Sequence, residues 1–207
     1  MAIVFFAFKP APWLFAVEIV LFLVFVWMLS FFRDPQRDIN PDEKILLSPA
    51  DGTITDISTL DDSALGPALR IGIFLSVFNV HINRAPCSVR VERVSYKKGR
   101  FKNAMSPESG RINESNDITM LRLAEPKERL LVRQISGAVA RRIVCEAGEA
   151  DEYRQGEAFG MIKFGSRTEL YLPASEQENF EVLVKVGDKV AAGLTALVRY
   201  KTWYNES

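Results

Sequence analysis

The sequence predicts an all-β or β-dominated domain behind an N-terminal membrane helix or helical hairpin. Near the N-terminus twenty consecutive residues are almost entirely apolar, and beyond residue 44 short segments alternate between apolar and polar side chains. Alternation with a period of two is typical of strands that bury one face. With 207 residues, 48% hydrophobic and 25% charged, the chain is long enough for one globular domain and an anchor.

The apolar run extends from Trp13 to Phe32, and Glu18 is its only charge. Twenty helical residues match the hydrocarbon core of a bilayer, about 30 Å thick, so we expect residues 1–32 to be a membrane-associated segment. A cleaved signal peptide fits less well, because bulky residues follow the run where small cleavage-site residues belong. The earlier apolar patch at residues 3–8 is too short to span alone, which leaves a shallow hairpin as an alternative.

The charges that flank the apolar run predict its orientation. Arg33 and Arg37 follow the run, whereas Lys9 is the only basic residue before it. Because basic flanks tend to stay in the cytoplasm, we expect a protein of the cell membrane with its soluble domain on the cytoplasmic side. Residues 33–44 are polar, contain two prolines and have no apolar period, so they are expected to be a linker before a domain at residues 45–207.

The soluble part contains several short segments that are predicted to be strands, because turn-forming residues bound each of them. These segments are TITDIS, LRIGIFLSV, VRVERVSY, ITMLRL, LVRQIS, AFGMIKF, TELYL, FEVLVKV and ALVRY. Residues 138–145 fit a helix and a strand equally well. Residues 102–117 are polar and without periodicity, which predicts a long loop, either a mobile lid or a solvated connection without a role.

The composition argues against several classes of function. The 26 basic and 26 acidic side chains cancel, so no nucleic acid partner is expected. Cys87 and Cys145 lie outside any CxxC pattern, and His81 is the only histidine. Neither a disulfide framework nor a metal site is therefore expected.

The two ends of the soluble domain share a likeness to one fold. Residues 48–58 (SPADGTITDIS) and residues 181–200 (EVLVKVGDKVAAGLTALVRY) resemble the strand and turn pattern of the barrel-sandwich fold of biotinyl and lipoyl carrier domains. No lysine in a carrier-type MKM or DKA turn lies between them. We therefore expect a barrel-sandwich domain that is not a swinging-arm carrier.

Three further motifs are candidates for chemistry: PADG at residues 49–52, FNVHINRAP at residues 78–86 and FGSR at residues 164–167. Each has an ordinary structural explanation, as a turn, a buried histidine or a strand bulge. In this order, together with the anchor, they resemble the short type of phosphatidylserine decarboxylase proenzyme. The resemblance covers nearly the whole soluble domain.

That resemblance implies a lyase of phospholipid biosynthesis that decarboxylates phosphatidylserine to phosphatidylethanolamine. It implies autocatalytic serinolysis between Gly165 and Ser166, which leaves a larger chain of residues 1–165 and a smaller chain of residues 166–207. Ser166 then becomes a covalent pyruvoyl group, the only cofactor implied, which forms a Schiff base with the serine head group of the substrate.

The residue types at these positions suit that chemistry. A glycine at position 165 allows the strained backbone that brings the Ser166 hydroxyl onto the preceding carbonyl carbon. His81 is the candidate base, because the unperturbed pKa of histidine lies near neutrality, and Asp51 is the candidate to orient it. The candidate contacts to the phosphate or carboxylate of the substrate are Asn83, Arg84, Lys163 and Arg167.

One position departs from the family pattern. Longer bacterial relatives carry two histidines in the segment that matches HINRAP, and Arg84 stands here in place of the second. If that histidine drives cleavage, either His81 serves both reactions or Asp51 acts more directly. The alternative function is a non-catalytic, membrane-anchored barrel-sandwich adaptor, which explains the anchor and the two domain ends but not HINRAP or FGSR. The sequence leaves a homo-oligomer open.

Overall fold

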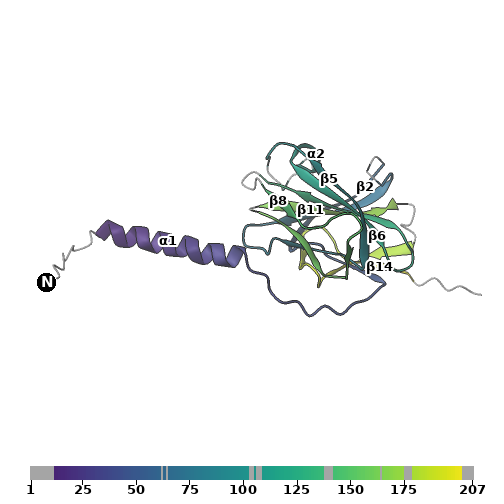
Figure 1. Ribbon diagram of the computed structural model, residues 1–207, viewed down its shortest axis with the longest axis horizontal. Coiled ribbons are helices and arrows are strands. Elements are labelled where there is room, and N and C mark those ends of the chain that lie inside the picture. The colour runs from purple at the N-terminus through teal and green to yellow at the C-terminus, as the bar shows by residue number, and fades with distance from the viewer. Residues whose placement is uncertain are drawn as a thin grey trace, which may run out of the picture. The chain divides into compact units, whose positions relative to one another are not determined.

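A computed structural model of the chain describes residues 12–61, 63, 65–102, 105, 109–137, 142–163, 165–174 and 179–201. The chain divides into two units, one ending at Arg33 and the other beginning at Asp34. The first contains helix α1 (Pro12–Phe31), and the second consists mainly of strands (Figure 1). The prediction of a β-dominated fold behind an N-terminal helix is confirmed.

Helix α1 is long and apolar enough to cross a membrane over Trp13–Phe31. The hydrocarbon core of a membrane offers no hydrogen-bond partners to the backbone. A helix can cross it because its own N–H and C=O groups pair with one another. The helix therefore supports association with a membrane. The side on which the soluble unit lies stays a prediction.

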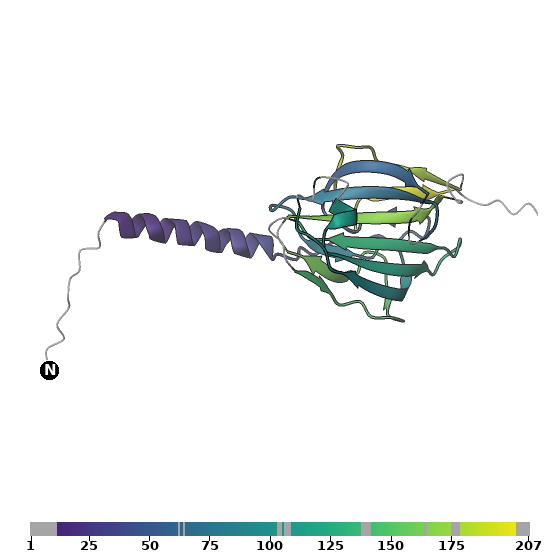
Figure 2. The ribbon, with the colours of Figure 1, turned by 90° about the horizontal axis from the view of Figure 1, so that it is seen from above.

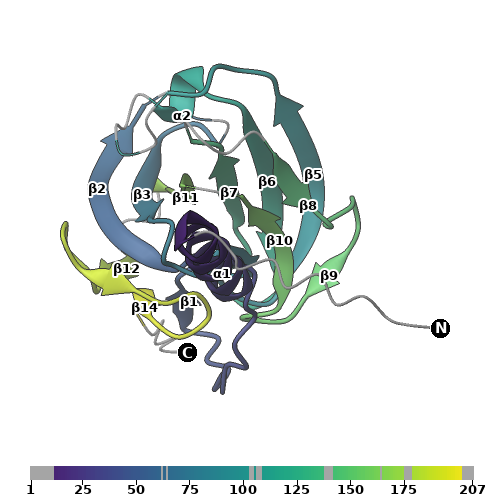
Figure 3. The ribbon, with the colours of Figure 1, turned by 90° about the vertical axis from the view of Figure 1, so that its left-hand side faces the viewer.

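The second unit is built on an eight-stranded sheet in which every pair of neighbours is antiparallel. The strand order is β13-β2-β3-β11-β7-β6-β5-β9, and Figure 3 shows β2, β3, β11, β7, β6 and β5 following one another around a curve. Figure 2 shows the same strands side by side from another direction. Their bounds are β2 (Gly52–Leu60), β3 (Ala68–Leu75), β5 (Val89–Lys97), β6 (Ser115–Arg122), β7 (Arg129–Ile135), β9 (Glu152–Tyr153), β11 (Ser166–Pro173) and β13 (Lys189–Val190).

Two three-stranded sheets complete the unit, in the orders β4-β10-β8 and β1-β14-β12. Their strands are β1 (Ile45–Leu47), β4 (Ile82–Arg84), β8 (Ile143–Cys145), β10 (Ala158–Ile162), β12 (Phe180–Val182) and β14 (Ala196–Tyr200). Of the two alternatives for residues 138–145, the described part is a strand, and residues 138–141 lie outside the described residues. The loop expected at residues 102–117 is shorter than predicted, because α2 (Ser109–Ile112) interrupts it and β6 begins at Ser115.

The apolar core joins the large sheet to both small ones. Leu46 of β1, Phe159 of β10 and Leu170 of β11 belong to one buried cluster. Because side chains alternate along a strand, Ser166 and Thr168 share the core-facing side of β11 with Leu170. The start of β11 is thus directed into the interior of the unit.

The segment at residues 34–44 lies against the strands, although a polar linker was expected there. Asp42 N donates to Gln155 Oε1 at 2.8 Å, and Gln155 Nε2 donates to Ile45 O at 2.8 Å. Ile39 occupies the space beside Gly156, where an added Cβ would lie 2.3 Å from its Cδ1. These contacts fix the segment to the domain. The alternation of apolar and polar residues in the sequence could not have predicted them.

Candidate active site

Ser166 is the first residue of β11 and is completely buried. It pairs with Leu75 of β3, and the next residue of β11 pairs with Ile135 of β7. Its Oγ has no hydrogen-bond partner among the described residues. Since an unsatisfied buried hydroxyl costs free energy, such an atom is a candidate for a functional group.

Gly165 precedes this serine with a φ of +64°. Residues with a Cβ are strained in this left-handed region, whereas glycine adopts it readily. An added Cβ would meet no atom within 4 Å, so the backbone direction rather than crowding requires glycine here. Phe164 of the FGSR motif lies outside the described residues.

The three sequence motifs meet in space. Pro49 O of the PADG turn accepts hydrogen bonds from Arg84 N at 3.0 Å and from Asn83 Nδ2 at 3.2 Å. Asn83 Nδ2 also lies 3.0 Å from Thr168 Oγ1, two residues beyond Ser166. The PADG turn, the HINRAP strand and the start of β11 therefore form one site, although more than one hundred residues separate the first motif from the last.

His81 lies just before β4 and is completely buried. Its Nδ1 is 3.0 Å from Asn79 O, and its backbone oxygen accepts a hydrogen bond from Ile162 N at 3.1 Å. A carbonyl oxygen can only accept, so Nδ1 carries the hydrogen of the neutral ring. Nε2 is then the nitrogen with the lone pair that can take up a proton.

The partners of Asp51 differ from the expected partner, His81. Its carboxylate accepts from Arg37 Nη2 at 2.9 and 3.0 Å and from Ala192 N at 2.7 Å. Among the described residues, Asp51 makes no hydrogen bond to His81. The carboxylate fixes the PADG turn between residue 37 and the backbone that follows β13.

The four expected substrate contacts separate into two pairs. Asn83 and Arg167 are completely buried with their polar atoms engaged inside the protein, so the structure does not place them against a substrate. Arg84 donates to Gly156 O at 3.1 Å and to Asp34 Oδ1 at 2.5 Å. Lys163 is only half-buried.

Arg84 also borders a cavity of about 720 Å³. Ser88, directly before β5, and Leu123, directly after β6, also line this cavity, so it lies at the end of the large sheet opposite Ser166. The cavity beside Arg84 therefore does not adjoin the Gly165–Ser166 bond.

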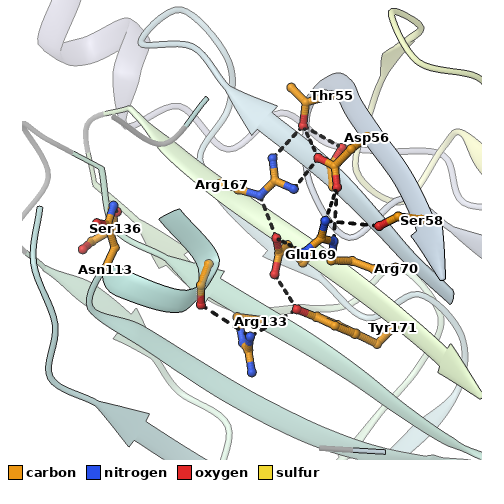
Figure 4. A network of polar contacts seen from close by, with 12 residues as sticks. Thr55, Asp56, Ser58, Arg70, Asn113, Arg133, Ser136, Arg167, Glu169 and Tyr171 are labelled. Carbon is orange, nitrogen blue, oxygen red and sulfur yellow. Dashed lines mark hydrogen bonds and ion pairs between the residues drawn. The ribbon is translucent and has the colours of Figure 1, made fainter. Parts of the chain in front are cut away.

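Arg167 instead organises a charged network on the other face of β11 (Figure 4). Its guanidinium donates to Glu169 Oε1 at 2.8 Å, to Thr55 Oγ1 at 2.6 Å and to Asp56 Oδ2 at 2.5 Å. Gly72 makes room for it, because an added Cβ there would lie 2.0 Å from Arg167 Nη2. The guanidinium thus ties β11 to β2.

The same network continues along the sheet toward β7 and β6. Tyr171 Oη donates to Glu169 Oε2 at 2.6 Å, and Arg133 holds Asp117 through two hydrogen bonds of 2.6 and 2.7 Å. Burial, reinforced by the charge of Glu169, raises the pKa of Tyr171. Burial opposes ionisation of Asp56, but the hydrogen bond and charge of Arg167 keep its pKa below the usual value. Asp56 is therefore ionised at neutral pH, and Tyr171 is protonated.

A second polar group, on the core-facing side, consists of uncharged side chains. Asn116 Nδ2 donates to Gln134 Oε1 at 3.3 Å, Gln134 Nε2 donates to Asn83 Oδ1 at 2.9 Å, and Asn83 reaches Thr168. Sequence reasoning missed both networks. The sequence signal for the charged network was the pair of charged residues at positions 167 and 169, because residues two apart on a strand share a face.

Comparisons with known proteins agree on one family. The family model described as phosphatidylserine decarboxylase matches residues 24–198. A phosphatidylserine decarboxylase proenzyme of Carboxydothermus hydrogenoformans is 44% identical over 185 residues, covering 88% of this chain and 84% of the relative. One of Rhodopirellula baltica is 47% identical over 191 residues, covering 91% and 77%, and one of Pelagibacter ubique is 41% identical over 179 residues, covering 84% and 80%.

Proposed function

Since the chain belongs to the phosphatidylserine decarboxylase family, we propose that it cuts its own Gly165–Ser166 bond and then decarboxylates phosphatidylserine to phosphatidylethanolamine with a pyruvoyl group derived from Ser166. Membership of this family decides between enzyme and adaptor in favour of the enzyme. The observation that carries the cleavage proposal is the buried Ser166 Oγ, without a partner among the described residues, beside a glycine at positive φ.

Cleavage begins when Ser166 Oγ attacks the carbonyl carbon of Gly165. The hydroxyl proton goes to a base, the carbon–nitrogen bond breaks, and the nitrogen leaves as the amine of Ser166, so an ester replaces the amide. Removal of the Ser166 α-proton then expels the carboxylate of Gly165 from Cβ. Tautomerisation of the resulting enamine to an imine, and hydrolysis by water, release ammonia and leave a ketone at the former Ser166 α-carbon.

His81 is the proposed base for these proton transfers. The hydrogen bond from Nδ1 to Asn79 O supports the role, because it leaves Nε2 to accept a proton. Asp51 is proposed to act indirectly: it holds the PADG turn, whose Pro49 O binds the backbone of Arg84. His81 is thus proposed as the base in both self-cleavage and decarboxylation, so no second histidine is needed at position 84.

The environment of Ser166 fits a small uncharged carbonyl group. The residue is buried at the end of a strand, and its α-carbon is held by pairing with β3 on one side of β11. The pyruvoyl group supplies an electrophilic carbonyl that condenses with the substrate amine and takes up the electron pair left by departing CO2. Because β3 and β7 belong to residues 1–165, their pairing with β11 keeps residues 166–207 bound after the cut.

The remaining site residues are assigned by their positions. The half-buried Lys163, three positions before Ser166, is proposed to bind the phosphate or carboxylate of the substrate. Arg84, whose side chain lines the cavity at the other end of the large sheet, is proposed to hold the segment at Asp34 in place instead. Asn83 and Arg167 are proposed to hold β11 in place from its two faces. Helix α1 would keep the enzyme, on the cytoplasmic side, at the bilayer that retains the acyl chains of the substrate.

The experiment is release of labelled CO2 from carboxyl-labelled phosphatidylserine by the purified full chain. The wild-type chain should release CO2, and Ser166→Ala should release none. Ser95→Ala, which changes an exposed serine on β5, is the matched control and should behave as wild type. Release of CO2 by Ser166→Ala would contradict the pyruvoyl mechanism.

A further inference from the structure

Strand pairing places Ser166 at one end of the large sheet together with the ends of four other strands. β11 pairs through Ser166 with the last residue of β3, and through its next residue with the last residue of β7. The last residue of β7 pairs with the first of β6, which pairs with the last of β5. We call this end the Ser166 rim, and its residues are Leu75, Ser166, Ile135, Ser115 and Lys97.

One segment that extends beyond this rim is the turn from β3 to His81. At the centre of the turn the side chain of Phe78 is 73% exposed. Ser76 and Asn79 close the turn, since Ser76 N and Oγ lie 2.9 and 2.8 Å from Asn79 Oδ1. The turn that carries the proposed base thus presents a large aromatic side chain to the outside.

A second segment, which we call the basic arm, continues β5 and returns to β6, over residues 97–102 and 111–114. Arg100 N donates to Ile112 O at 2.8 Å, and Glu114 N donates to Arg100 O at 3.0 Å. Asn113 is buried and donates from Nδ2 to Lys102 O at 2.7 Å. These bonds give the arm a defined structure rather than that of a loose loop.

The basic arm concentrates positive charge in a chain whose formal net charge is zero. Five of its side chains are basic, and Glu114 is its one acidic side chain. All five basic residues are exposed: Lys97, Lys98, Arg100, Lys102 and Arg111. Tyr96, directly before the arm, is 56% exposed. Exposed basic residues beside an exposed aromatic side chain are the combination that suits an anionic bilayer surface.

We propose that the Ser166 rim docks on the anionic surface of a phospholipid bilayer, with the basic arm against the head groups and Phe78 in the interface. The proposal rests on the proposed function, which gives the enzyme an anionic lipid as substrate. Attraction between basic side chains and an anionic bilayer acts only within about one Debye length, roughly 10 Å at 0.1 M salt. Docking at this rim brings the head group to Ser166 while the acyl chains stay in the bilayer.

A labelling experiment tests docking without relying on catalysis. The full chain is placed in nanodiscs of phosphatidylcholine alone or of an equal mixture with phosphatidylglycerol, and exposed lysines are acetylated with a water-soluble reagent. Mass spectrometry should find Lys98 and Lys102 acetylated at least about fivefold more slowly in the anionic discs. Lys127, at the opposite end of the sheet, should react equally in both. Equal rates for the arm lysines in the two lipids would overturn the proposal.

An activity ratio tests whether docking serves the reaction. Lys98→Gln, Arg100→Gln and Lys102→Gln are combined, and Lys97 is kept because its Nζ donates to Arg111 O. The ratio of activity on phosphatidylserine vesicles to activity on water-soluble short-chain phosphatidylserine should fall about tenfold. The control combines Arg90→Gln, Lys127→Gln and Arg129→Gln, all exposed near the far end of the sheet, and should keep the wild-type ratio.

The outcomes separate the two proposals. An unchanged ratio in the arm variant, or an equal loss on both substrates, contradicts docking by the arm. A wild-type chain that decarboxylates neither substrate contradicts the proposed function, and the labelling result then still decides whether the rim docks.

Discussion

Arg167 Nε lies 2.8 Å from Glu169 Oε1, and both side chains are completely buried. This ion pair begins one residue beyond the bond that we propose to be cut. It secures the start of β11 on the face opposite the apolar core, so the strand that begins at the reacting serine is held in one position. Burial alone would lower the pKa of Arg167, but Glu169 and Asp56 raise it, so the guanidinium stays charged.

Arg167→Met should lower the free energy of unfolding by about 3–5 kcal/mol, because Arg70 alone would then have to balance the charges of both Asp56 and Glu169. The measurement is thermal or denaturant unfolding in detergent, in a Ser166→Ala background so that cleavage does not interfere. Arg129→Met is the matched control, since Arg129 pairs with Glu92 but is 66% exposed, and should cost at most about 1 kcal/mol. Similar losses in both variants would contradict the role given to Arg167.

The network also predicts how stability depends on pH. The pKa of Asp56 is lowered in the folded chain, so its contribution is present above the unfolded value of about 4 and is lost as pH falls through the folded pKa. Asp56→Asn should therefore be less stable than wild type near neutrality, and the difference should narrow below about pH 4. Unfolding midpoints of both proteins, in the Ser166→Ala background, measure this. A stability difference between the two proteins that stays constant down to pH 3 would contradict a lowered pKa for Asp56.

Gly72→Ala should disturb the same network from the neighbouring strand. Its Cβ would lie 2.0 Å from Arg167 Nη2, a group already held by hydrogen bonds. We expect a loss of about 1–3 kcal/mol in stability, as for other overpacked sites, and slower cleavage in the otherwise unchanged chain. Gly148→Ala is the control, because the nearest atom to its Cβ is Asp151 Oδ2 at 3.3 Å. Normal stability and cleavage in Gly72→Ala would show that the network can shift without consequence.

The role of Asp51 can be separated from that of a direct partner of His81. If Asp51 works by holding Arg37 and the backbone of Ala192, then Arg37→Gln and Asp51→Asn should slow cleavage to a similar degree. The double variant should be no slower than the slower single one, because the residues form one unit. Cleavage rates are followed by electrophoresis after synthesis. A loss of about 10³-fold or more in Asp51→Asn alone would instead indicate direct action on the base.

The strands and the apolar helix could be predicted from the sequence because each is marked by a local pattern of apolar residues. Residues 68–75 and 196–200 alternate or are continuously apolar, and both are strands. The docking of residues 34–44 depends on hydrogen bonds to Gln155, more than one hundred positions away, and no local pattern reports such contacts.

The motifs that the sequence singles out come together in the fold, but the contacts that their side chains make could not be predicted. Asn83 and Arg167 were expected to reach the substrate, because exposed amides and guanidinium groups bind phosphate. The same side chains can equally satisfy buried partners, and here Gln134 and Glu169 supply them. Only the pairing of strands distant in sequence distinguishes these two uses.

The central claim is tested most directly by the intact mass of the purified full chain. The account predicts two species, residues 1–165 and residues 166–207, with the smaller one lighter by one ammonia than the same fragment released by simple hydrolysis. Ser166→Ala should give a single unbroken chain. A wild-type chain that stays intact on long incubation, or a small fragment that begins with a free amine at Ser166, would contradict the account.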